Sequence, residues 1–581
     1  MTSNHPRPSP QMHALVNRYL RGELSRRDFL RAAIAVGGLT AVQAILAACA
    51  PAPAPSAPAA GGSAQTGATP QAGAASAAEP KMLIYAASQD IPTIDPSDRT
   101  DYSIGAVSRQ LYDRLFRFEG GWPQPIEPCL CESYQGSDDA TEWTFKLTDK
   151  AVFHNGDPVT AEAVVYSYQR TLRFQKQRSS LIAPFLDEDG IQAVDDRTVR
   201  MVLKSPFGDF PRLLAFHEQP IMNPKQVKEH EQGGDEGAAW LVENEAGSGP
   251  FVIKEWEPGN RYVLEAVPDY WQGWPGESRL AGFVWRIIRE TADRRIALLA
   301  GEVDIADTIS TDDIDIIDNT PGYHVEENFG LLAGYVKMNN QMEPTSDLHF
   351  RKFIAYAMDY EALVNVLGGH AKLMTGPIPE GVPYQDPNVQ PQYRHDLEKA
   401  KEHLDQTPWK DGGIELDYVY VTGLDFEEQL GLILLEQLGK FNIKVNMVPK
   451  VWPDMVAACG QPETGPHLIN IFVDSGPIPY NWFVEQWYSK SWNRETGGSF
   501  QTCDFYSNPE VDTLVETLRG AVDPAEQERI VKELQQIIME DIPGLPVYVL
   551  PSLIGLSDKV RGYVFYGDIS VDFWRLWLAD A

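Results

Sequence analysis

The sequence predicts an α/β body, because short segments with strand patterning alternate along the chain with segments of helical periodicity. Apolar and polar residues alternate over residues 143–147, as in a half-buried strand, whereas apolar residues recur at helical spacing over residues 350–367. About five hundred residues follow the Pro- and Ala-rich N-terminal part, which is too long for one core and predicts two or three lobes.

The first predicted element of this body is a buried strand that begins at Met82. Its apolar run ends at Tyr85, and Pro92 and Pro96 then hold the following loop in an extended conformation. We therefore expect a buried strand that leads into an extended loop.

A half-buried strand and a helix are predicted on either side of a turn at residues 155–158. The strand covers residues 143–147, and Thr160 has the position and side chain of a helix N-cap. The residues of this helix that are expected to face the core are Val164, Val165 and Tyr168.

The rest of the chain continues the alternation. Residues 251–253 and 262–264 read as two strands around a turn at residues 257–260. Further helices are predicted over residues 350–367, 427–439 and 510–540.

The N-terminus has the pattern of an export signal. Arg26 and Arg27 lie in a segment that resembles the twin-arginine signal, and a modest apolar run over residues 32–48 follows it. This run is too short and too weakly apolar for a good stop-transfer helix. It ends at Leu-Ala-Ala-Cys, so we expect residues 1–48 to be a signal peptide and Cys49 to carry a lipid.

Residues 49–80 are rich in Pro, Ala, Gly and Ser. Such a segment cannot bury enough apolar surface to offset its ordering entropy, so we expect a disordered linker. A coil of this length spans roughly 30 Å. The linker would therefore act as a leash between the lipid and the folded body.

Composition excludes some classes of protein. The formal net charge is −33, which would repel phosphate backbones, so we expect no nucleic-acid partner. Catalytic motifs for a serine hydrolase, a zinc protease or a P-loop enzyme are not found, and no cofactor is expected. The acidic residues at 312–318 lack the pattern of a calcium loop and favour a solvated helix face, so no metal is expected.

The four cysteines beyond Cys49 leave their redox state open. A disulfide between Cys459 and Cys503 is conceivable outside the cell, but buried free thiols are an equal alternative. Cys129 and Cys131 would face one side of a strand, and a direct bridge between them would strain the backbone.

Six segments together resemble one protein family, the extracytoplasmic solute-binding proteins of family 5, whose members include oligopeptide, dipeptide and nickel binders of ABC importers. The resemblance recurs in the expected order over nearly the whole chain after the linker. The segments are 143–170 (WTFKLTDKAVFHNGDPVTAEAVVYSYQR), 247–271 (GSGPFVIKEWEPGNRYVLEAVPDYW), 294–306 (RRIALLAGEVDIA), 350–369 (FRKFIAYAMDYEALVNVLGG), 375–382 (TGPIPEGV) and 537–550 (IIMEDIPGLPVYVL).

The resemblance implies a periplasmic-binding-protein-like fold of class II, with two main lobes joined by a hinge and an extra lobe inserted near the N-terminus. The solute would lie in the cleft between lobes I and III, which would close over it by hinge bending. The implied bounds are 81–115, 245–337 and 546–581 for lobe I, 116–244 for lobe II and 338–545 for lobe III.

Three regions are expected to line that cleft. The first is the loop Gln89, Asp90 and Ile91, which in peptide-binding relatives lies against the ligand backbone. The second is Trp452, at a position where relatives place a pocket tryptophan. The third contains Phe472, Asp474, Tyr480 and Trp482. Core packing is the alternative for both tryptophans.

Asp474 is the most specific of these residues. In peptide-binding relatives an aspartate at the corresponding place pairs with the α-amino group of the ligand, through a charge-assisted hydrogen bond. The surrounding stretch, IFVDSGPIPYNWF, lacks the Trp that commonly precedes this aspartate and the Tyr and Asp-Pro that follow it. The alternative is an aspartate that caps the turn at Ser475 and Gly476.

The resemblance thus implies a binding protein rather than an enzyme. It would capture a small solute, first a peptide, and deliver it to the permease of an ABC importer as a monomer on the outer face of the cytoplasmic membrane. An oligosaccharide, a nickel chelate or another small cation would be alternative solutes. An exported hydrolase, chaperone or receptor would be the alternative classes.

Overall fold

The computed structural model describes the part of the chain that follows the linker. It describes residues 80–98, 102–118, 125–176, 179, 182–215, 219–275, 279–422, 424–492, 501–566 and 571–580. Arg26, Arg27, Cys49 and the linker to residue 79 lie outside the described residues.

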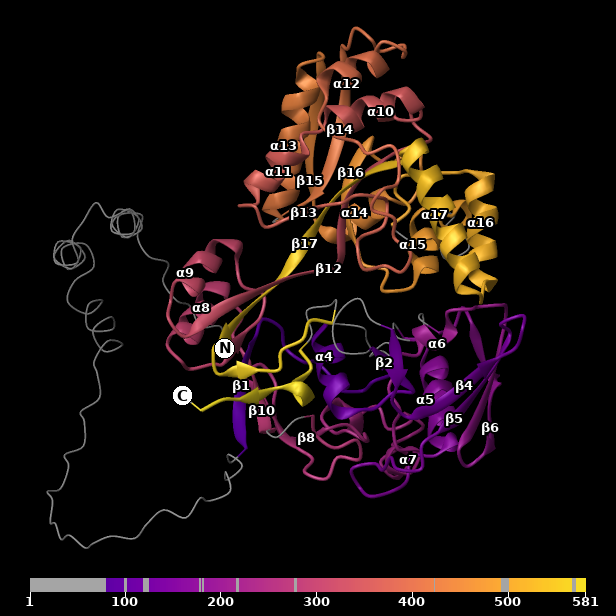
Figure 1. The fold of residues 1–581 in the computed structure, drawn as a ribbon, viewed down its shortest axis with the longest axis vertical. Helices are drawn as coiled ribbons and strands as arrows, with labels where there is room; N and C mark the ends of the chain where they lie inside the picture. The colour runs from indigo at the N-terminus through magenta and orange to yellow at the C-terminus, as the bar shows by residue number, and fades with distance from the viewer. Residues whose placement is uncertain are drawn as a thin grey trace, which may run out of the picture. The chain divides into compact units, whose positions relative to one another are not determined.

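One long mixed sheet runs through this body (Figure 1). Across the sheet the order is β15 (Ile443–Lys450), β14 (Ile414–Val421), β16 (Leu468–Val473), β12 (Tyr323–Met338), β17 (Gly544–Ser557), β11 (Ile305–Ala306), β1 (Lys81–Ala87), β10 (Leu280–Ile287), β9 (Arg261–Ala266) and β8 (Phe251–Glu257), with β13 (Lys372–Leu373) beside β17.

Two long antiparallel strands, β12 and β17, hold the two ends of this sheet together (Figure 1). Their register runs from Tyr323 opposite Ser557 to Lys337 opposite Gly544. At one end β17 pairs with β11, and at the other end β12 pairs with β16. In the part of the chain that the structure describes, the sheet is therefore continuous from the β1 side to the β14 side through these two strands.

Alternate residues of β14 face two different cores. Tyr418 belongs to a core with Leu430 and Leu434 of α13 (Asp425–Gly439). Val419 belongs to a second core with Leu534. Side chains of a strand alternate between its faces, so β14–β16 are covered on both sides. The other helices of this region are α10 (Leu348–Ala357), α11 (Tyr360–Val366), α12 (Leu397–Leu404), α14 (Trp452–Ala458), α15 (Pro479–Gln486), α16 (Pro509–Gly520) and α17 (Pro524–Asp541).

A second, antiparallel sheet has its own core. Its order is β4 (Cys131–Gly136), β5 (Glu142–Leu147), β7 (Thr198–Leu203) and β6 (Leu186–Asp195), and α5 (Ala161–Phe174) packs on β6 and β7. The remaining described elements are α4 (Tyr102–Leu111), α6 (Phe210–Leu213), α7 (Pro224–Glu229), α8 (Thr291–Leu299) and α9 (Ile314–Asp318), with the short pairs β2 (Phe116–Phe118) with β3 (Ile126–Pro128) and β18 (Val560–Arg561) with β19 (Trp577–Leu578).

The predicted α/β body is confirmed, but two predicted helices are each divided. The segment 350–367 forms α10 and α11, because the chain is extended at Met358 and Asp359 caps the second helix through the N–H of Ala362. The segment 510–540 forms α16 and α17, where Asp523 caps and Pro524 begins the second helix. Local capping thus interrupted an otherwise continuous apolar period.

Thr160 is the N-cap residue of α5 with an extended backbone, but its side chain accepts no capping hydrogen bond. Val164 and Tyr168 are buried as expected, whereas Val165 is only partly buried. The helix is therefore positioned by its apolar face.

Cys459 and Cys503 form a disulfide, whereas Cys129 and Cys131 are buried thiols. Of the acidic residues at 312–318, Asp313 is buried and pairs with Arg295, and the others belong to a short helical segment. Within the described ranges there is no cluster of metal-ligating side chains. None of the helices described is long and apolar enough to span a membrane.

Candidate functional site

Three parallel strands end at one edge of the long sheet. β14 pairs in parallel with both β15 and β16, and the three strands end at Val421, Lys450 and Val473. Ligands of open α/β sheets bind outside the carboxyl ends of such strands. Asp474 follows β16 directly, and Trp452 lies two residues after β15. Sequence-predicted residues from two of the three strands therefore lie at this edge.

The exposed Asp474 begins a tight loop. Its Oδ1 accepts a hydrogen bond from the N–H of Gly476 at 3.0 Å. The same loop is tied down by Trp482, whose Nε1 donates to the carbonyl oxygen of Gly476 at 2.7 Å. The capping geometry considered for Asp474 is present, and it leaves the carboxylate at the surface of the strand edge.

The two predicted site residues of α15, Tyr480 and Trp482, differ in exposure. Trp482 is fully buried, so it packs in the core and fixes the loop. Tyr480 is partly buried and its ring meets the ring of Phe207 edge-on, with 5.8 Å between centroids. Phe472, within β16, is partly buried against Phe426, at 4.9 Å between ring centroids.

The loop Gln89–Ile91 is anchored to neighbouring strands. Ile91 is buried in the core around β1, and the Asp90 carboxylate accepts a hydrogen bond from the hydroxyl of Tyr262. The carbonyl oxygen of Gln89 accepts one from Nε1 of Trp285 at 3.3 Å. Among the described residues, no hydrogen bond or ion pair joins this loop to Asp474 or Tyr480. The structure does not bring the two predicted groups into contact.

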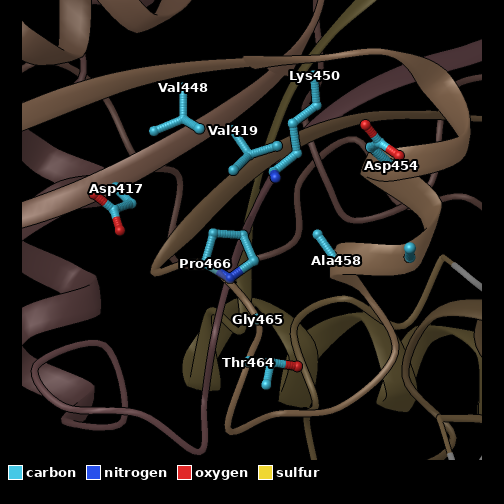
Figure 2. A pocket seen from close by; sticks show the side chains of 10 residues that line it. Asp417, Val419, Val448, Lys450, Asp454, Ala458, Thr464, Gly465 and Pro466 are labelled. Atoms are coloured by element: carbon cyan, nitrogen blue, oxygen red, sulfur yellow. The ribbon is translucent and has the colours of Figure 1, made fainter.

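A cavity of about 500 Å³ lies beside α14 (Figure 2). The Lys450 side chain points into it, and Asp417 and Asp454 stand on either side. None of the sequence-predicted site residues lines it; Trp452, 47% exposed, begins the helix that forms one wall. Its lining residues are Asp417, Val419, Val448, Lys450, Asp454, Ala457, Ala458, Thr464, Gly465 and Pro466.

Sequence reasoning missed two carboxyl groups near the strand edge. Burial raises the pKa of Glu485, on α15, to about 7, although a hydrogen bond from Ser475 lowers it. Burial also raises the pKa of Glu427, on α13, to about 7, and its carboxylate accepts the N–H of Val421 at 2.6 Å. Glu485 stands among large apolar residues in the run Trp-Phe-Val-Glu-Gln-Trp, and this neighbourhood is the sequence feature that could have predicted a buried carboxyl.

A buried ion pair lies behind α15. Lys337 Nζ is 3.0 Å from Asp504 Oδ2 and 3.0 Å from Oε1 of Gln486, and both charged side chains are 0% exposed. Burial lowers the pKa of Lys337 and raises that of Asp504, because it disfavours both charges. Asp504 follows the disulfide residue Cys503, so the disulfide ties this segment to Cys459 at the end of α14 and the ion pair ties it to β12.

The region around the second sheet, which contains β4 to β7, contacts the C-terminal end of α16. The N–H of Gly208 donates to the carbonyl oxygen of Arg519 at 3.1 Å. A Cβ on Gly208 would lie 1.9 Å from the carbonyl oxygen of Ala521, so only glycine allows this approach. Ile478, four residues after Asp474, packs in the core of the second sheet. The loop that carries Asp474 therefore contacts both sheets.

Comparison with known proteins gives a consistent result. The model of the bacterial extracellular solute-binding proteins, family 5 (middle region), matches residues 125–500. The Escherichia coli (strain K12) protein named "Probable D,D-dipeptide-binding periplasmic protein DdpA" is 32% identical over 496 residues, which cover 84% of this chain and 93% of that protein. The glutathione-binding protein GsiB of the same strain is 25% identical over 506 residues, with 85% and 94% coverage.

Two solved structures have the same fold. HbpA2 from Haemophilus parasuis superposes with a TM-score of 0.77 at 21% identity, covering 86% of this chain and 100% of that one. The periplasmic binding protein DppA from Helicobacter pylori, in complex with the peptide STSA, has a TM-score of 0.68 at 23% identity, with 86% and 98% coverage. The fold expected from the sequence is confirmed by these likenesses.

Proposed function

Because this chain belongs to the bacterial extracellular solute-binding proteins of family 5, we propose that it captures a short peptide outside the cytoplasm and delivers it to the permease of an ABC importer. The two relatives described above are named as a probable D,D-dipeptide-binding protein and a glutathione-binding protein, and D,D-dipeptides and glutathione are both peptides with a free amino group. The observation that carries the proposal for this chain is Asp474 at the carboxyl end of β16, where an ammonium group can reach it.

The proposed binding cleft lies between lobes I and III. Lobe I would comprise residues 81–115, 245–337 and 546–581, lobe II residues 116–244 and lobe III residues 338–545. The long pair β12 and β17 supports this division, because among the described strands these two connect the β1 side of the sheet with the β14 side. Hinge bending of this pair would bring the loop Gln89–Ile91 toward Asp474.

The residues proposed to line the cleft have different roles. Asp474 would pair with the α-amino group, while Trp452, Phe472 and Tyr480 would supply apolar surface. Trp482 would act through the loop that it holds, since its ring is buried and its Nε1 bonds the carbonyl oxygen of Gly476. Gln89, Asp90 and Ile91 would face the ligand from lobe I.

The proposal includes the membrane tether. Export through the twin-arginine signal at Arg26 and Arg27, followed by lipidation of Cys49, would keep a monomeric binder next to its permease. Residues 49–80 would give it reach. Mass spectrometry of the mature protein from its native membrane tests this step, because a diacylglycerol on an N-terminal Cys49 is the expected product and a mature chain that begins elsewhere would contradict it.

A thermal-shift screen tests the solute class. The panel would contain D-alanyl-D-alanine, L-alanyl-L-alanine, glutathione, an oligosaccharide and a nickel–histidine chelate, together with mass spectrometry of whatever co-purifies. Peptides are expected to raise Tm. A rise only with the oligosaccharide or the chelate would overturn the peptide proposal and favour one of the other solutes. Hydrolysis of any bound probe would contradict a pure binding role.

The contribution of Asp474 is tested with a charge-matched control. Asp474→Asn is expected to weaken peptide binding by about tenfold to a hundredfold, as the loss of a charge-assisted hydrogen bond of roughly 1.5–3 kcal/mol predicts. Glu463→Gln removes the same charge from an exposed residue before the start of β16, and it is expected to leave the affinity unchanged. Equal effects of the two variants would exclude a specific role for Asp474.

A further inference from the structure

A buried arginine lies where the core around β1 meets the core of the second sheet. Arg114 belongs to the short segment that leads from α4 to β2, and its carbonyl oxygen accepts the N–H of Leu130 at 2.9 Å. Tyr112, two residues before it, packs in the core around β1, whereas Leu115 packs in the core of the second sheet. The backbone on both sides of Arg114 is therefore fixed, and its side chain starts from a defined position.

The guanidinium of Arg114 has no partner. The residue is only 8% exposed. Within the described part of the chain, no carboxylate lies at ion-pair distance from its nitrogens and no oxygen accepts a hydrogen bond from them. Nε is fully buried without an acceptor, whereas the two Nη groups, which also lack one, keep some contact with solvent. An external ion can therefore reach this guanidinium from the side of its Nη groups.

The positive charge of Arg114 persists despite its burial. Burial lowers the pKa of this guanidinium, the charge of Arg109 lowers it further, and the carboxylate of Asp572 opposes the change. Arginine nevertheless stays protonated in proteins. Because the transfer of an unpaired ion out of water is costly, buried charges are paired or hold an ion. The described side chains around Arg114 do not offset this cost.

The carboxylates in this part of the fold serve other arginines. Asp572 accepts the hydroxyl proton of Tyr566 at 3.1 Å and pairs with Arg575 at 3.3 Å. Glu127 pairs with Arg117 at 2.5 Å and with Arg575 at 3.5 Å. Two carboxylates are thus shared by two arginines, and neither forms an ion pair with the buried guanidinium of the preceding paragraphs.

Two further acidic groups close in sequence do not supply the missing charge. Asp113 accepts hydrogen bonds from three neutral donors. These are the hydroxyls of Ser248 and Tyr270 and Nε1 of Trp271, at 3.0, 2.7 and 2.7 Å. Burial raises the pKa of the Cys129 thiol to about 12, so this group stays uncharged. In the described structure neither group is an ion-pair partner of the buried arginine.

Other arginines make the surroundings of Arg114 electropositive. Arg109 lies over the ring of Tyr566, 5.2 Å from its centroid, and Arg117 lies over the ring of Trp574 at 4.4 Å. The charges of both arginines act on Arg114. Since like charges repel, an anion at this place relieves the repulsion. The paired N–H groups of a guanidinium match two oxygens of a carboxylate, sulfate or phosphate, so the chemistry selects an oxyanion.

We propose that Arg114 is the anchor of an oxyanion site at the junction of the two cores, where its Nη groups hold a carboxylate or an inorganic oxyanion. Arg109 and Arg117 would add attraction at longer range. A free ion needs no solute, so in that case the site is independent of the proposed function, whereas the carboxylate of a captured solute would rest on it. Binding exchanges water for the anion and involves no covalent step.

The unpaired charge has a consequence for the protein without its anion. Arg114→Met removes an uncompensated buried charge at similar side-chain volume, so the variant is expected to be at least as stable as wild type in anion-poor buffer. If water or the fold satisfied the guanidinium, the same change would destabilise the protein. Arg529→Met is the matched control, because this exposed arginine already pairs with Glu526 and Glu533. It is expected to change stability little.

Thermal unfolding at increasing concentrations of sodium acetate or sodium sulfate, with ionic strength held constant by sodium chloride, tests the site. Wild type is expected to show a saturable rise in Tm. Sulfate also stabilises proteins through its exclusion from their surfaces, so the specific effect is the difference between wild type and Arg114→Met. The variant is expected to bind either anion about tenfold to a hundredfold more weakly. Arg529→Met should keep the wild-type dependence.

Two further probes separate the sources of the oxyanion. L-alanyl-L-alanine and L-alanyl-L-alanine amide differ in their C-terminal carboxylate, and isothermal titration calorimetry in Tris chloride measures the affinity of each. Weaker binding of the amide to wild type, together with weaker binding of the dipeptide to Arg114→Met, would assign the site to the carboxylate of a solute. Equal binding of both probes to both proteins, with an acetate and sulfate effect confined to wild type, would assign it to a free ion.

Three results would overturn the site. The first is a wild-type protein that responds to neither acetate, sulfate nor the carboxylate of the dipeptide. The second is an equal response of wild type and Arg114→Met to all of these probes. The third is a variant that is clearly less stable than wild type in anion-poor buffer or does not fold, as judged by circular dichroism, because the fold or water would then satisfy the guanidinium. None of these results would affect peptide binding through the remaining proposed residues.

Discussion

Replacing Lys337 by methionine is expected to lower the free energy of unfolding by about 3–5 kcal/mol. The ammonium group lies 3.0 Å from both Asp504 and Gln486 and is fully buried, with ring centroids of Tyr335 and Trp487 at 5.1 and 4.9 Å. Methionine fills nearly the same volume, so little cavity forms. The cost arises because Asp504 remains buried without a counter-charge.

A double variant separates the electrostatic cost of the Lys337→Met change from its effect on packing. In Lys337→Met with Asp504→Leu, neither charge remains, so the desolvation penalty of both groups disappears. The double variant is therefore expected to recover most of the stability lost in the single one. Unfolding in urea, followed by tryptophan fluorescence and by circular dichroism under oxidising conditions, measures both. Trp487 contacts the pair and serves as a local probe.

Two results would refute this reasoning. A single variant within about 1 kcal/mol of wild type would mean that Asp504 finds water or another donor in the folded state. A double variant that is less stable than the single one would mean that Asp504 stabilises the fold even without Lys337, so an uncompensated buried charge would not be the cause of the loss in the single variant. Either result would also change the account of how the segment after Cys503 is held.

Three further predictions concern the disulfide, the buried carboxyl of Glu427 and the close contact at Gly208. Replacing both Cys459 and Cys503 by alanine should cost about 4 kcal/mol in urea unfolding, from the loop entropy of a 44-residue separation, and a loss below about 1 kcal/mol would contradict that estimate. Burial raises the pKa of Glu427 from 4.5 to about 7, so the folded state binds the extra proton in that window and wild-type stability falls as pH rises through it. Glu427→Gln should therefore be more stable than wild type at pH 8, by up to about 3 kcal/mol, and similar at pH 4.5; parallel pH profiles would refute this. Gly208→Val should weaken peptide binding at least about tenfold, because its side chain would collide with the carbonyl oxygen of Ala521; unchanged affinity would show that the contact plays no part in closure.

The sequence predicted the elements of the fold well where the pattern is local. Residues 143–147 alternate because one face of β5 is buried, and the structure has this strand at Glu142–Leu147. The division of 350–367 into two helices was missed, because the apolar period continues across the cap at Asp359. A capping carboxylate is visible in the sequence, but which of several acidic residues turns the chain depends on tertiary packing.

The sequence predicted the position of some candidate site residues, whereas their role in ligand binding stays a prediction. Asp474 follows β16 directly and is exposed, and Trp482 is buried, as its core-packing alternative expected. Glu485 could not be singled out beforehand, because its hydrogen bond with Ser475, the residue after Asp474, depends on the turn at Gly476 and on the direction of α15. Such a hydrogen bond between residues ten positions apart is a property of the folded loop rather than of either residue type.

The buried disulfide also bears on the route by which the chain leaves the cytoplasm. Cys459 and Cys503 are 3% and 1% exposed, so an oxidant reaches them only while the segment is open. A chain exported already folded comes from a reducing compartment as a dithiol and must open locally before it can be oxidised. A chain exported unfolded meets the oxidant before its core forms. The delay between arrival outside the cytoplasm and loss of thiol reactivity, measured by pulse-chase alkylation, should thus be long for twin-arginine export and short for threading of an unfolded chain.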